Sequence, residues 1–256
     1  MQMQLFYKKH SFFDNSVSRG SYICAVIHFA AHADVAESFK STSEYYANNV
    51  RKYMNFLSVH SRMSPHIPII FLSSYSVYGQ SDHFVAIEGL EYEHVSPYGR
   101  TKAICETPNK DFSSCYGMKM LNLRYLNVHG AWPEEHLGKM HNPDSHILPL
   151  LIDVVHTFGP FILRGSFYNT ADGTAVRDFV HIIDLADAQI TALGYLARVT
   201  IDSNYCDTYN VDSGPGTSVL MVIKTVERQT QSSIGIIWYA TRGRHGDYCD
   251  RSIQDE

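Results

Sequence analysis

The sequence has no apolar run approaching the ~20 residues that a membrane-spanning helix needs. Its first residues, MQMQLFYKKHSFFDN, contain no apolar stretch typical of a secretory signal, because lysines and a histidine interrupt them. Lysine and arginine are scattered without a basic cluster, and the formal net charge is -5. That charge argues against a nucleic-acid-binding face. The sequence therefore predicts neither a membrane nor a nucleic acid as a partner.

Disulfide and metal motifs are lacking as well. The five cysteines have an odd count, irregular spacing and no C-x-x-C motif, which is typical of reduced thiols in a cytoplasmic protein. The fourteen histidines include no H-E-x-x-H motif, so we expect no metal site. The chain has 256 residues, 45% of them apolar and 18% charged, which is the composition of a globular protein with a sizeable core.

A continuous apolar run at Cys24–Ala31 predicts a strand that is buried on both faces. We expect a second buried strand at Ile67–Ser74 and a third at Lys119–Tyr125. Between the first two, residues 41–62 carry apolar side chains at helical spacing, namely Tyr46, Val50, Tyr53 and Leu57. The alternation of strands and helices predicts an α/β fold with a parallel sheet.

The remaining segments predict further helices and one strand. We expect Pro108 to end the helix that begins near Tyr98, because proline interrupts helical hydrogen bonding. The later elements are a helix from about Ser145 to His156, a helix with Asp184 as its N-cap, a strand and turn at Asp207–Gly214, and a helix at Thr217–Arg228.

The segment SPYGRTK, Ser96 to Lys102, places a tyrosine and a lysine four residues apart, on one face of a helix. An ammonium beside a phenol stabilises the phenolate, so Tyr98 is suited to proton transfer. Ser74, at the end of the preceding strand, is suited to share a substrate oxygen with Tyr98. A Y-x-x-x-K pattern alone mostly marks an ordinary exposed helix. Together with a strand-end serine in a parallel α/β pattern, it favours a site for hydride transfer.

Polar and small residues follow all three predicted strands. FAAHAD follows the first strand, SSYSVYG the second and LNVHGAW the third. The carboxyl ends of parallel strands meet at one edge of the sheet, where ligands bind. The three clusters therefore predict a single crevice.

Nine stretches, in order, resemble the extended short-chain dehydrogenase/reductases, and within them the NAD-dependent epimerase/dehydratase family and its UDP-glucose 4-epimerases. The stretches are AVIHFAAHADVAES, EYYANNV, FLSSYSVYG, SPYGRTK, LRYLNVHGAWP, PDSHILPLLI, DGTAVRDFVHIIDLADAQITAL, YNVDSGPGTSVLMVI and GRHGD. The resemblance implies a Rossmann-like parallel sheet with a smaller α/β substrate-binding region. It implies a dinucleotide-binding domain at 1–127, with 166–197 returning to it, and a sugar-nucleotide-binding region at 128–165 and 198–256.

The resemblance also implies functional residues and ligands. The implied cofactor is NAD and the implied substrate is a UDP-sugar, interconverted between UDP-glucose and UDP-galactose. The implied catalytic residues are Ser74, Tyr98 and Lys102. The residues implied to line the dinucleotide are Phe29, Ala30, Asn48, Ser73 and Tyr125. The residues implied around the UDP-sugar are Asn127, His146, Arg177, Arg244 and Asp247.

Two further features refine the implied reaction. Related dehydratases carry an Asp-Glu pair directly after the catalytic serine or threonine, whereas Tyr75 and Ser76 follow Ser74 here. The resemblance therefore favours epimerisation through a 4-keto intermediate. It also implies a homodimer that pairs through the helix from Ser43 to Arg62 and the helix that starts at Tyr98.

The sequence departs from the family in lacking the G-x-x-G-x-x-G turn that cradles a pyrophosphate, and its first glycine is Gly20. The opening QLFYKKHSFFD resembles the family's third strand. This implies that the first βαβ unit is missing, that the strand at Cys24–Ala31 has an unpaired edge, and that the C-terminal part is truncated. Three hypotheses remain open: an NAD-dependent UDP-sugar 4-epimerase, a non-catalytic sugar-nucleotide-binding relic, and another NDP-sugar short-chain dehydrogenase/reductase.

Overall fold

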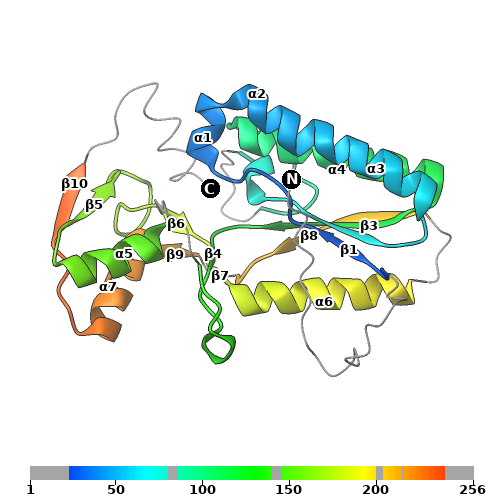
Figure 1. The fold of residues 1–256 in the computed structure, drawn as a ribbon. Coiled ribbons are helices and arrows are strands. Elements are labelled where there is room, and N and C mark those ends of the chain that lie inside the picture. The colour runs from blue at the N-terminus through cyan, green and yellow to red at the C-terminus, as the bar shows by residue number, and fades with distance from the viewer. Residues whose placement is uncertain (1–22, 80–85, 140–145, 200–203, 215, 240–256) are drawn as a thin grey trace.

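A four-stranded parallel sheet lies at the centre of the larger region of the chain (Figure 1). The computed structural model describes residues 23–79, 86–139, 146–199, 204–214 and 216–239. In spatial order, the strands are β1 (Val26–His28), β2 (Ile69–Leu72), β3 (Lys119–Tyr125) and β8 (Tyr205–Val211). One face is covered by α1 (Val35–Lys40), α2 (Thr42–Tyr45), α3 (Lys52–Met63) and α4 (Pro97–Tyr116), and the other by α6 (Ile182–Arg198) (Figure 1). The predicted parallel α/β fold is confirmed.

The inner strand β2 is apolar because both of its faces are covered. All four of its residues are buried. Ile69 and Phe71 face the α3–α4 layer, and Ile70 and Leu72 face α6. By contrast, β1 has three half-buried residues and is shorter than the predicted run. Among the described residues β1 pairs only with β2 and forms an edge of the sheet. Only three residues of the predicted strand Cys24–Ala31 therefore form strand hydrogen bonds.

The predicted helix of residues 41–62 is present, but a π-helical turn at Tyr46–Arg51 separates α2 from α3. A π turn closes i→i+5 hydrogen bonds and so takes up more residues than an α turn. The inward positions before Tyr53 are therefore Tyr45 and Asn49. Of the predicted inward positions, Tyr53 and Leu57 are buried and the half-buried Val50 packs against the same cluster, whereas Tyr46 is only half-buried and the buried tyrosine is Tyr45.

The prediction that Pro108 ends its helix is wrong, because α4 continues for 20 residues to Tyr116. Proline removes the N–H that would bond the carbonyl four residues earlier. That carbonyl belongs to Ile104, which lies on the exposed side of the helix, with 37% of the residue exposed. Beyond the proline, the helix is anchored by contacts to the sheet. Asn109, fully buried, donates a hydrogen bond to Asn122 Oδ1 in β3 at 2.7 Å.

The N-cap of α6 is His181 rather than the predicted Asp184. His181 Nδ1 accepts a hydrogen bond from the Ile183 N–H at 3.3 Å. The helix begins directly after strand β7 (Val180–His181), which is three residues earlier than the sequence suggested. Asp184 lies in the first turn, where a carboxylate interacts favourably with the helix N-terminus.

Strand β8 belongs to the central sheet, where it pairs with β3 over seven residues. The sequence-based division had assigned 198–256 to the sugar-nucleotide-binding region, so the chain differs from that division at this strand. The reason is the crossover helix α6. Its buried Ala192 and Leu196 pack on the sheet with Leu121 and Leu123, and the chain leaves the helix beside the free edge of β3.

The second, smaller region contains paired short strands and two helices (Figure 1). The pairs are β5 (Phe161–Arg164) with β10 (Ile236–Tyr239), β6 (Val176–Arg177) with β9 (Thr217–Ser218), and β4 (Val128–His129) with β7. Helices α5 (Ile147–Thr157) and α7 (Val219–Thr230) match the predicted helices to within two residues. They share a core with β5 that includes Leu151, Leu163 and Ile223. No helix among the described residues is long and apolar enough to cross a membrane.

Candidate active site

Ser74 lies directly beyond the carboxyl end of β2, with an extended backbone at φ -153° and ψ 152°. It caps a 3₁₀ turn at Tyr75–Val77. Its Oγ accepts a hydrogen bond from the Ser76 N–H at 3.2 Å and donates one to Ser76 Oγ at 3.0 Å. Ser74 is 6% exposed. The short turn therefore holds its hydroxyl in one orientation at the end of the strand.

Helix α4 begins close to this turn. Ser96 caps the helix by accepting a hydrogen bond from the Gly99 N–H at 3.0 Å, and Pro97 occupies the first helical position, where proline is well tolerated. A Cβ on Gly99 would lie 2.3 Å from the Ser76 carbonyl oxygen. Only glycine therefore lets the helix approach so closely, and this approach brings Tyr98 beside the Ser74 turn.

Lys102 completes the group of three predicted catalytic residues. Its Nζ donates a hydrogen bond to the Leu72 carbonyl oxygen at 2.6 Å, at the end of β2. The same atom lies 6.0 Å from the centre of the Tyr98 ring and 5.0 Å from that of Phe71. Both Lys102 and Tyr98 are buried. The structure therefore brings Tyr98, Lys102 and the Ser74 segment together, as the sequence predicted.

The ammonium of Lys102 is buried, and it forms no ion pair with any residue that the structure describes. No carboxylate of the described residues lies within 4.0 Å of it. Burial lowers its pKa to about 8, while Cys105 and Glu106 act in the opposite direction. The bond to Leu72 O uses one of its three N–H donors, and no other hydrogen bond of Lys102 is found among the described residues. Two donors are thus left for a ligand.

Asn49, which the sequence reasoning missed, connects two elements that border the candidate site. It is 3% exposed. Its side chain bonds both backbone groups of His32, accepting from N–H at 2.8 Å and donating to the carbonyl at 3.0 Å. It also donates to Thr101 Oγ1 at 3.1 Å. Asn49 thus joins the loop after β1 to α4, next to Lys102. Its four-residue spacing from Tyr45 and Tyr53 was the available signal.

The residues predicted to line a dinucleotide after β1 and on the following helix differ in their exposure and contacts. Phe29 is 41% exposed and Ala30 is half-buried, both directly after β1. Asn48 is half-buried, and its Oδ1 accepts a hydrogen bond from Lys52 Nζ at 2.8 Å. The strand-end loop is therefore accessible, whereas Asn48 is engaged on its own helix.

The other two predicted cofactor residues lie at the ends of β2 and β3. The Ser73 hydroxyl donates a hydrogen bond to the buried carboxylate of Glu106. Tyr125 is the last residue of β3 and packs on the α6 side of the sheet. Burial raises the pKa of Tyr125 to about 12. Ser73 therefore faces the α4 side and Tyr125 the α6 side of the same sheet edge.

Asn127, predicted to contact the UDP-sugar, lies between β3 and β4, where the two regions join. Its backbone is in the left-handed region at φ 25°. Its side-chain Nδ2 is buried and has no hydrogen-bond partner among the described residues. An unsatisfied buried donor costs free energy, so this atom fits an acceptor supplied by a ligand.

The remaining predicted UDP-sugar residues are spread over the smaller region. Arg177 lies in β6 and is 6% exposed. His146 is exposed at the N-cap of α5, with its Nδ1 2.6 Å from Lys139 Nζ. Arg244 and Asp247 lie outside the described residues. The structure therefore describes three of the five predicted residues. Of these three, Asn127 lies nearest in the sequence to the end of β3.

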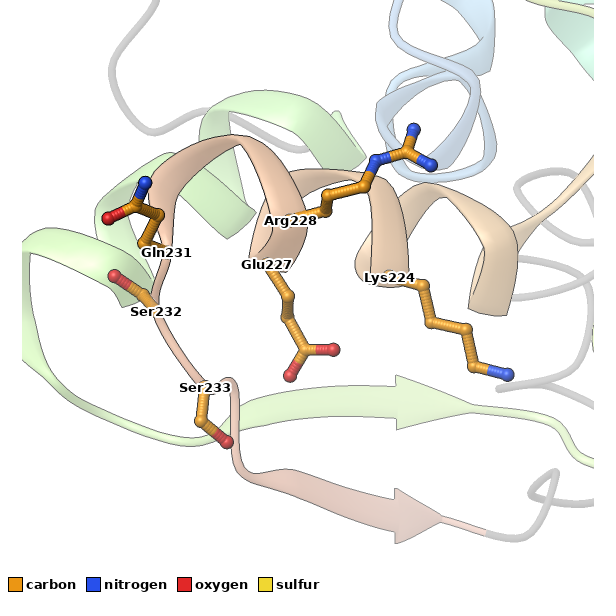
Figure 2. Close-up of a pocket in the computed structure, with 6 residues that line it drawn as sticks. All are labelled: Lys224, Glu227, Arg228, Gln231, Ser232 and Ser233. Carbon is orange, nitrogen blue, oxygen red and sulfur yellow. The ribbon is translucent and has the colours of Figure 1, made fainter.

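A surface depression on α7 lies away from the strand ends (Figure 2). Figure 2 shows Lys224 and Arg228 diverging from one another on the outer side of the helix. Glu227, also at this depression, accepts a hydrogen bond from the Ile234 N–H at 2.8 Å. It thereby fixes the turn into β10.

His28 and His32 have H-x-x-x-H spacing, which on a helix would suit a metal ion. Here the spacing falls on β1 and the loop after it. His28 packs against Tyr53, with ring centres 4.6 Å apart, and His32 lies 3.8 Å from Glu44. Across the part of the chain that the structure describes, no three His, Cys, Asp or Glu side chains are grouped to hold a metal ion.

Residues 14–210 match the profile of the NAD dependent epimerase/dehydratase family. The chain is 38% identical over 211 residues to the UDP-glucose 4-epimerase of Streptococcus mutans, and 36% identical over 225 residues to that of Rhizobium meliloti. These matches cover 82% and 87% of this chain, and 62% and 66% of the two relatives. The chain thus spans just under two thirds of the length of these relatives.

Solved structures give the same result. The UDP-glucose 4-epimerase from Brucella ovis in complex with NAD matches with a TM-score of 0.79 and 33% identity, over 86% of this chain and 66% of that one. The enzyme from Stenotrophomonas maltophila, with bound NAD and formylated UDP-arabinopyranose, matches with a TM-score of 0.79 and 31% identity, over 88% and 66%.

Proposed function

This chain belongs to the NAD dependent epimerase/dehydratase family, and from that premise we propose that it carries the catalytic group of an NAD-dependent UDP-glucose 4-epimerase. The reaction interconverts UDP-glucose and UDP-galactose through a 4-keto intermediate. The proposed catalytic residues are Ser74, Tyr98 and Lys102. Support comes from their geometry and from relatives of at least 30% identity that are named UDP-glucose 4-epimerases.

The observation that carries the proposal is the buried ammonium of Lys102. It lies at the end of β2, 6.0 Å from the Tyr98 ring centre, and no carboxylate of the described residues lies within 4.0 Å of it. A buried cation is costly unless something compensates it. A neighbouring phenolate and the hydroxyls of a bound ligand would do so. An ordinary helix surface offers no reason to bury a lysine here.

Each of the three side chains has a chemical role in this proposal. Tyr98 Oη takes the proton from the sugar C4 hydroxyl as that carbon is oxidised, and returns it after the 4-keto sugar has turned over. Ser74 Oγ hydrogen-bonds the same sugar oxygen. Lys102 favours the phenolate form of Tyr98 by its charge. Ser74 and Tyr98 are held to the same turn by the close approach of Gly99 to Ser76.

When bound, NAD would supply the hydride acceptor for the oxidation at C4 and the hydride donor for the reduction that follows. The two unused N–H donors of Lys102 fit ribose hydroxyls at the nicotinamide end. Phe29 and Ala30, at the accessible end of β1, would line that end. For the pyrophosphate the sequence offers no G-x-x-G-x-x-G turn, so the proposal assigns residues only to the nicotinamide end.

The sugar-nucleotide side is proposed to use Asn127, His146 and Arg177, together with Arg244 and Asp247. The buried, unpartnered Nδ2 of Asn127 supports this, because it needs an acceptor. A guanidinium such as that of Arg177 suits a diphosphate, which it can bond through two oxygens. Epimerisation is favoured over dehydration because Tyr75 and Ser76, rather than carboxylates, follow Ser74.

The test is to purify the chain and measure NAD binding by calorimetry, then turnover of UDP-galactose to UDP-glucose by chromatography. We expect Tyr98→Phe to keep NAD binding and to lower turnover by at least about a hundredfold, since it removes a general acid–base group. Tyr116→Phe is the matched control, because Tyr116 is 52% exposed on the same helix. Absence of NAD binding at millimolar NAD, or full turnover by Tyr98→Phe, would refute the proposal.

We also propose a homodimer that pairs through α3 and α4. Both helices expose large apolar side chains, including Val59 at 53%, Met63 at 76% and Ile104 at 37%. Exposed apolar groups of this kind mark interaction surfaces when they gather on one face. Light scattering should give twice the chain mass, and Met63→Glu should shift it toward the monomer. A wild-type chain that is monomeric at all concentrations would contradict pairing.

A cytoplasmic location stays a prediction from the odd, irregularly spaced cysteines. Fractionation of cells that express a tagged chain tests it, and recovery in the membrane or secreted fraction would contradict it.

A further inference from the structure

Glu106 is a fully buried carboxylate for which the proposed chemistry has no use. It is 0% exposed and its partner Arg124 is 2% exposed. The guanidinium bonds it through two parallel contacts, from Nε to Oε1 at 3.0 Å and from Nη2 to Oε2 at 2.5 Å. Ser73 Oγ also donates to Oε1, and Tyr92 OH donates to Oε2 at 2.8 Å. Both carboxylate oxygens therefore accept two hydrogen bonds each.

The four donors come from three separate segments of the chain. Ser73 follows β2, Arg124 lies in β3, and Tyr92 lies in the segment before α4. Arg124 Nη1 donates a hydrogen bond to Tyr78 OH at 2.5 Å, and Tyr78 OH donates one to Asn210 Oδ1 of β8 at 2.7 Å. The network thus spans the carboxyl ends of β2, β3 and β8, where the proposed active site lies.

Helix α4 is attached to the end of β2 by two side chains one turn apart. Lys102 Nζ bonds the carbonyl of Leu72 at 2.6 Å, and Glu106 bonds the hydroxyl of the next residue, Ser73. The residue after that is Ser74. These two bonds fix how far the helix is shifted along the strand, and hence where Lys102 stands relative to Ser74.

From this geometry we infer that Glu106, held by Arg124, is the positioning residue of the Ser74–Tyr98–Lys102 group. The inference deepens the proposed function and rests on it. Arg124 gives Glu106 a partner of its own, so the carboxylate does not turn back one helical turn to pair with Lys102. The ammonium of Lys102 thereby stays available to Tyr98 and to a bound ligand.

A purely stabilising role is a weak explanation for this pair. Burying two charges is costly, and an apolar pair of similar volume is often as stable or more stable. What an apolar pair cannot supply is the set of directional bonds to Ser73, Tyr92 and Tyr78. Replacing Glu106 and Arg124 together therefore distinguishes an effect on the stability of the fold from an effect on the position of the catalytic residues.

The experiment compares wild type with the double variant Glu106→Leu/Arg124→Met in the full chain. We expect the double variant to fold with an unfolding midpoint close to that of wild type, since no charge is left unpaired. Turnover should fall about a hundredfold with KM little changed, because small misplacements of catalytic groups cost that much. Asp111→Asn, an exposed carboxylate on the same helix, is the control and should behave as wild type.

A second measurement does not depend on turnover. Competitive labelling with acetic anhydride across pH, read by mass spectrometry, gives the titration midpoint of Lys102. The charged and titratable groups around this lysine are His28, Tyr98, Cys105 and Glu106. Glu106 partly offsets the effect of burial on the pKa of Lys102, so loss of its charge alone would lower the titration midpoint. A rise of the midpoint therefore reports a change in the position and solvation of Lys102. A looser Lys102 should titrate nearer its ordinary range than the wild-type pKa of about 8.

Each outcome decides the inference. A folded double variant with wild-type turnover and an unchanged Lys102 midpoint would overturn it. So would a double variant that does not fold, because the pair would then serve stability. If wild type itself shows no turnover, the proposed function fails. In that case the Lys102 midpoint alone supports or overturns the positioning role.

Discussion

Gly99→Ala, at the start of α4, has two opposite effects on stability: it improves helix propensity and it worsens packing. Alanine is favoured over glycine within a helix by up to about 1 kcal/mol. However, the new Cβ would lie 2.3 Å from the Ser76 carbonyl oxygen, whereas contacts below 3.0 Å are essentially never found for real Cβ atoms. Backbone must therefore move on the order of 1 Å, and overpacking of this kind costs about 1–3 kcal/mol. We expect a net loss of stability and, because Tyr98 moves with the helix, a loss of turnover.

Urea unfolding followed by circular dichroism measures the stability change. The matched control is Gly194→Ala within α6, where an added Cβ meets nothing within 4 Å. The control should raise the free energy of unfolding by up to about 1 kcal/mol, whereas Gly99→Ala should lower it. If Gly99→Ala proves as stable as wild type, the close approach of helix and turn is not a constraint, and the reasoning about Tyr98 fails with it.

Three further changes test the fold itself. Pro108→Ala restores an N–H that can bond the Ile104 carbonyl, so unfolding should require about 1–3 kcal/mol more; a less stable variant would show that the proline ring packs usefully. Leu196→Ala removes a fully buried side chain between α6 and the sheet and should cost about 2–5 kcal/mol in urea unfolding, so a cost below 1 kcal/mol would contradict that packing. Burial lowers the pKa of His28 to about 4. As pH falls from 6.5 towards 4, this histidine is protonated in the unfolded chain but not in the folded one, so the free energy of unfolding decreases across that window. His28→Phe should reduce this decrease, and an unchanged pH dependence would rule His28 out as its source.

Several elements could be predicted from local sequence alone. The strand Lys119–Tyr125 has the bounds that its apolar run indicated. The start of α4 follows from Ser96 as cap and Pro97 at the first helical position. The grouping of Ser74 with Tyr98 and Lys102 also follows from pattern, because parallel strands place their carboxyl ends together. For the strand and the helix start, neighbouring residues carry the information, whereas the grouping of Ser74 with Tyr98 rests on the order of strands and helices along the chain.

Other features depended on contacts between residues far apart in the chain. Pro108 carries a local penalty of about 3 kcal/mol against helix, yet contacts of α4 with the sheet outweigh it. The π turn that directs Asn49 toward the site is fixed by its bonds to His32 and Thr101, 17 and 52 residues away. The local sequence pattern cannot predict such distant partners.

The Glu106–Arg124 pair shows the same division most clearly. In the sequence, Glu106 reads as one more carboxylate on a helix, four residues after Lys102. Only the packed structure brings Ser73, Tyr92 and Arg124 to it. Helical and strand periodicity therefore sufficed to predict the parallel sheet and the helix that carries Tyr98 and Lys102, whereas the proposed catalytic roles of these residues and Ser74 came from the family resemblance. How those residues are held was decided by tertiary packing, because a buried charge must find its partners wherever the fold supplies them.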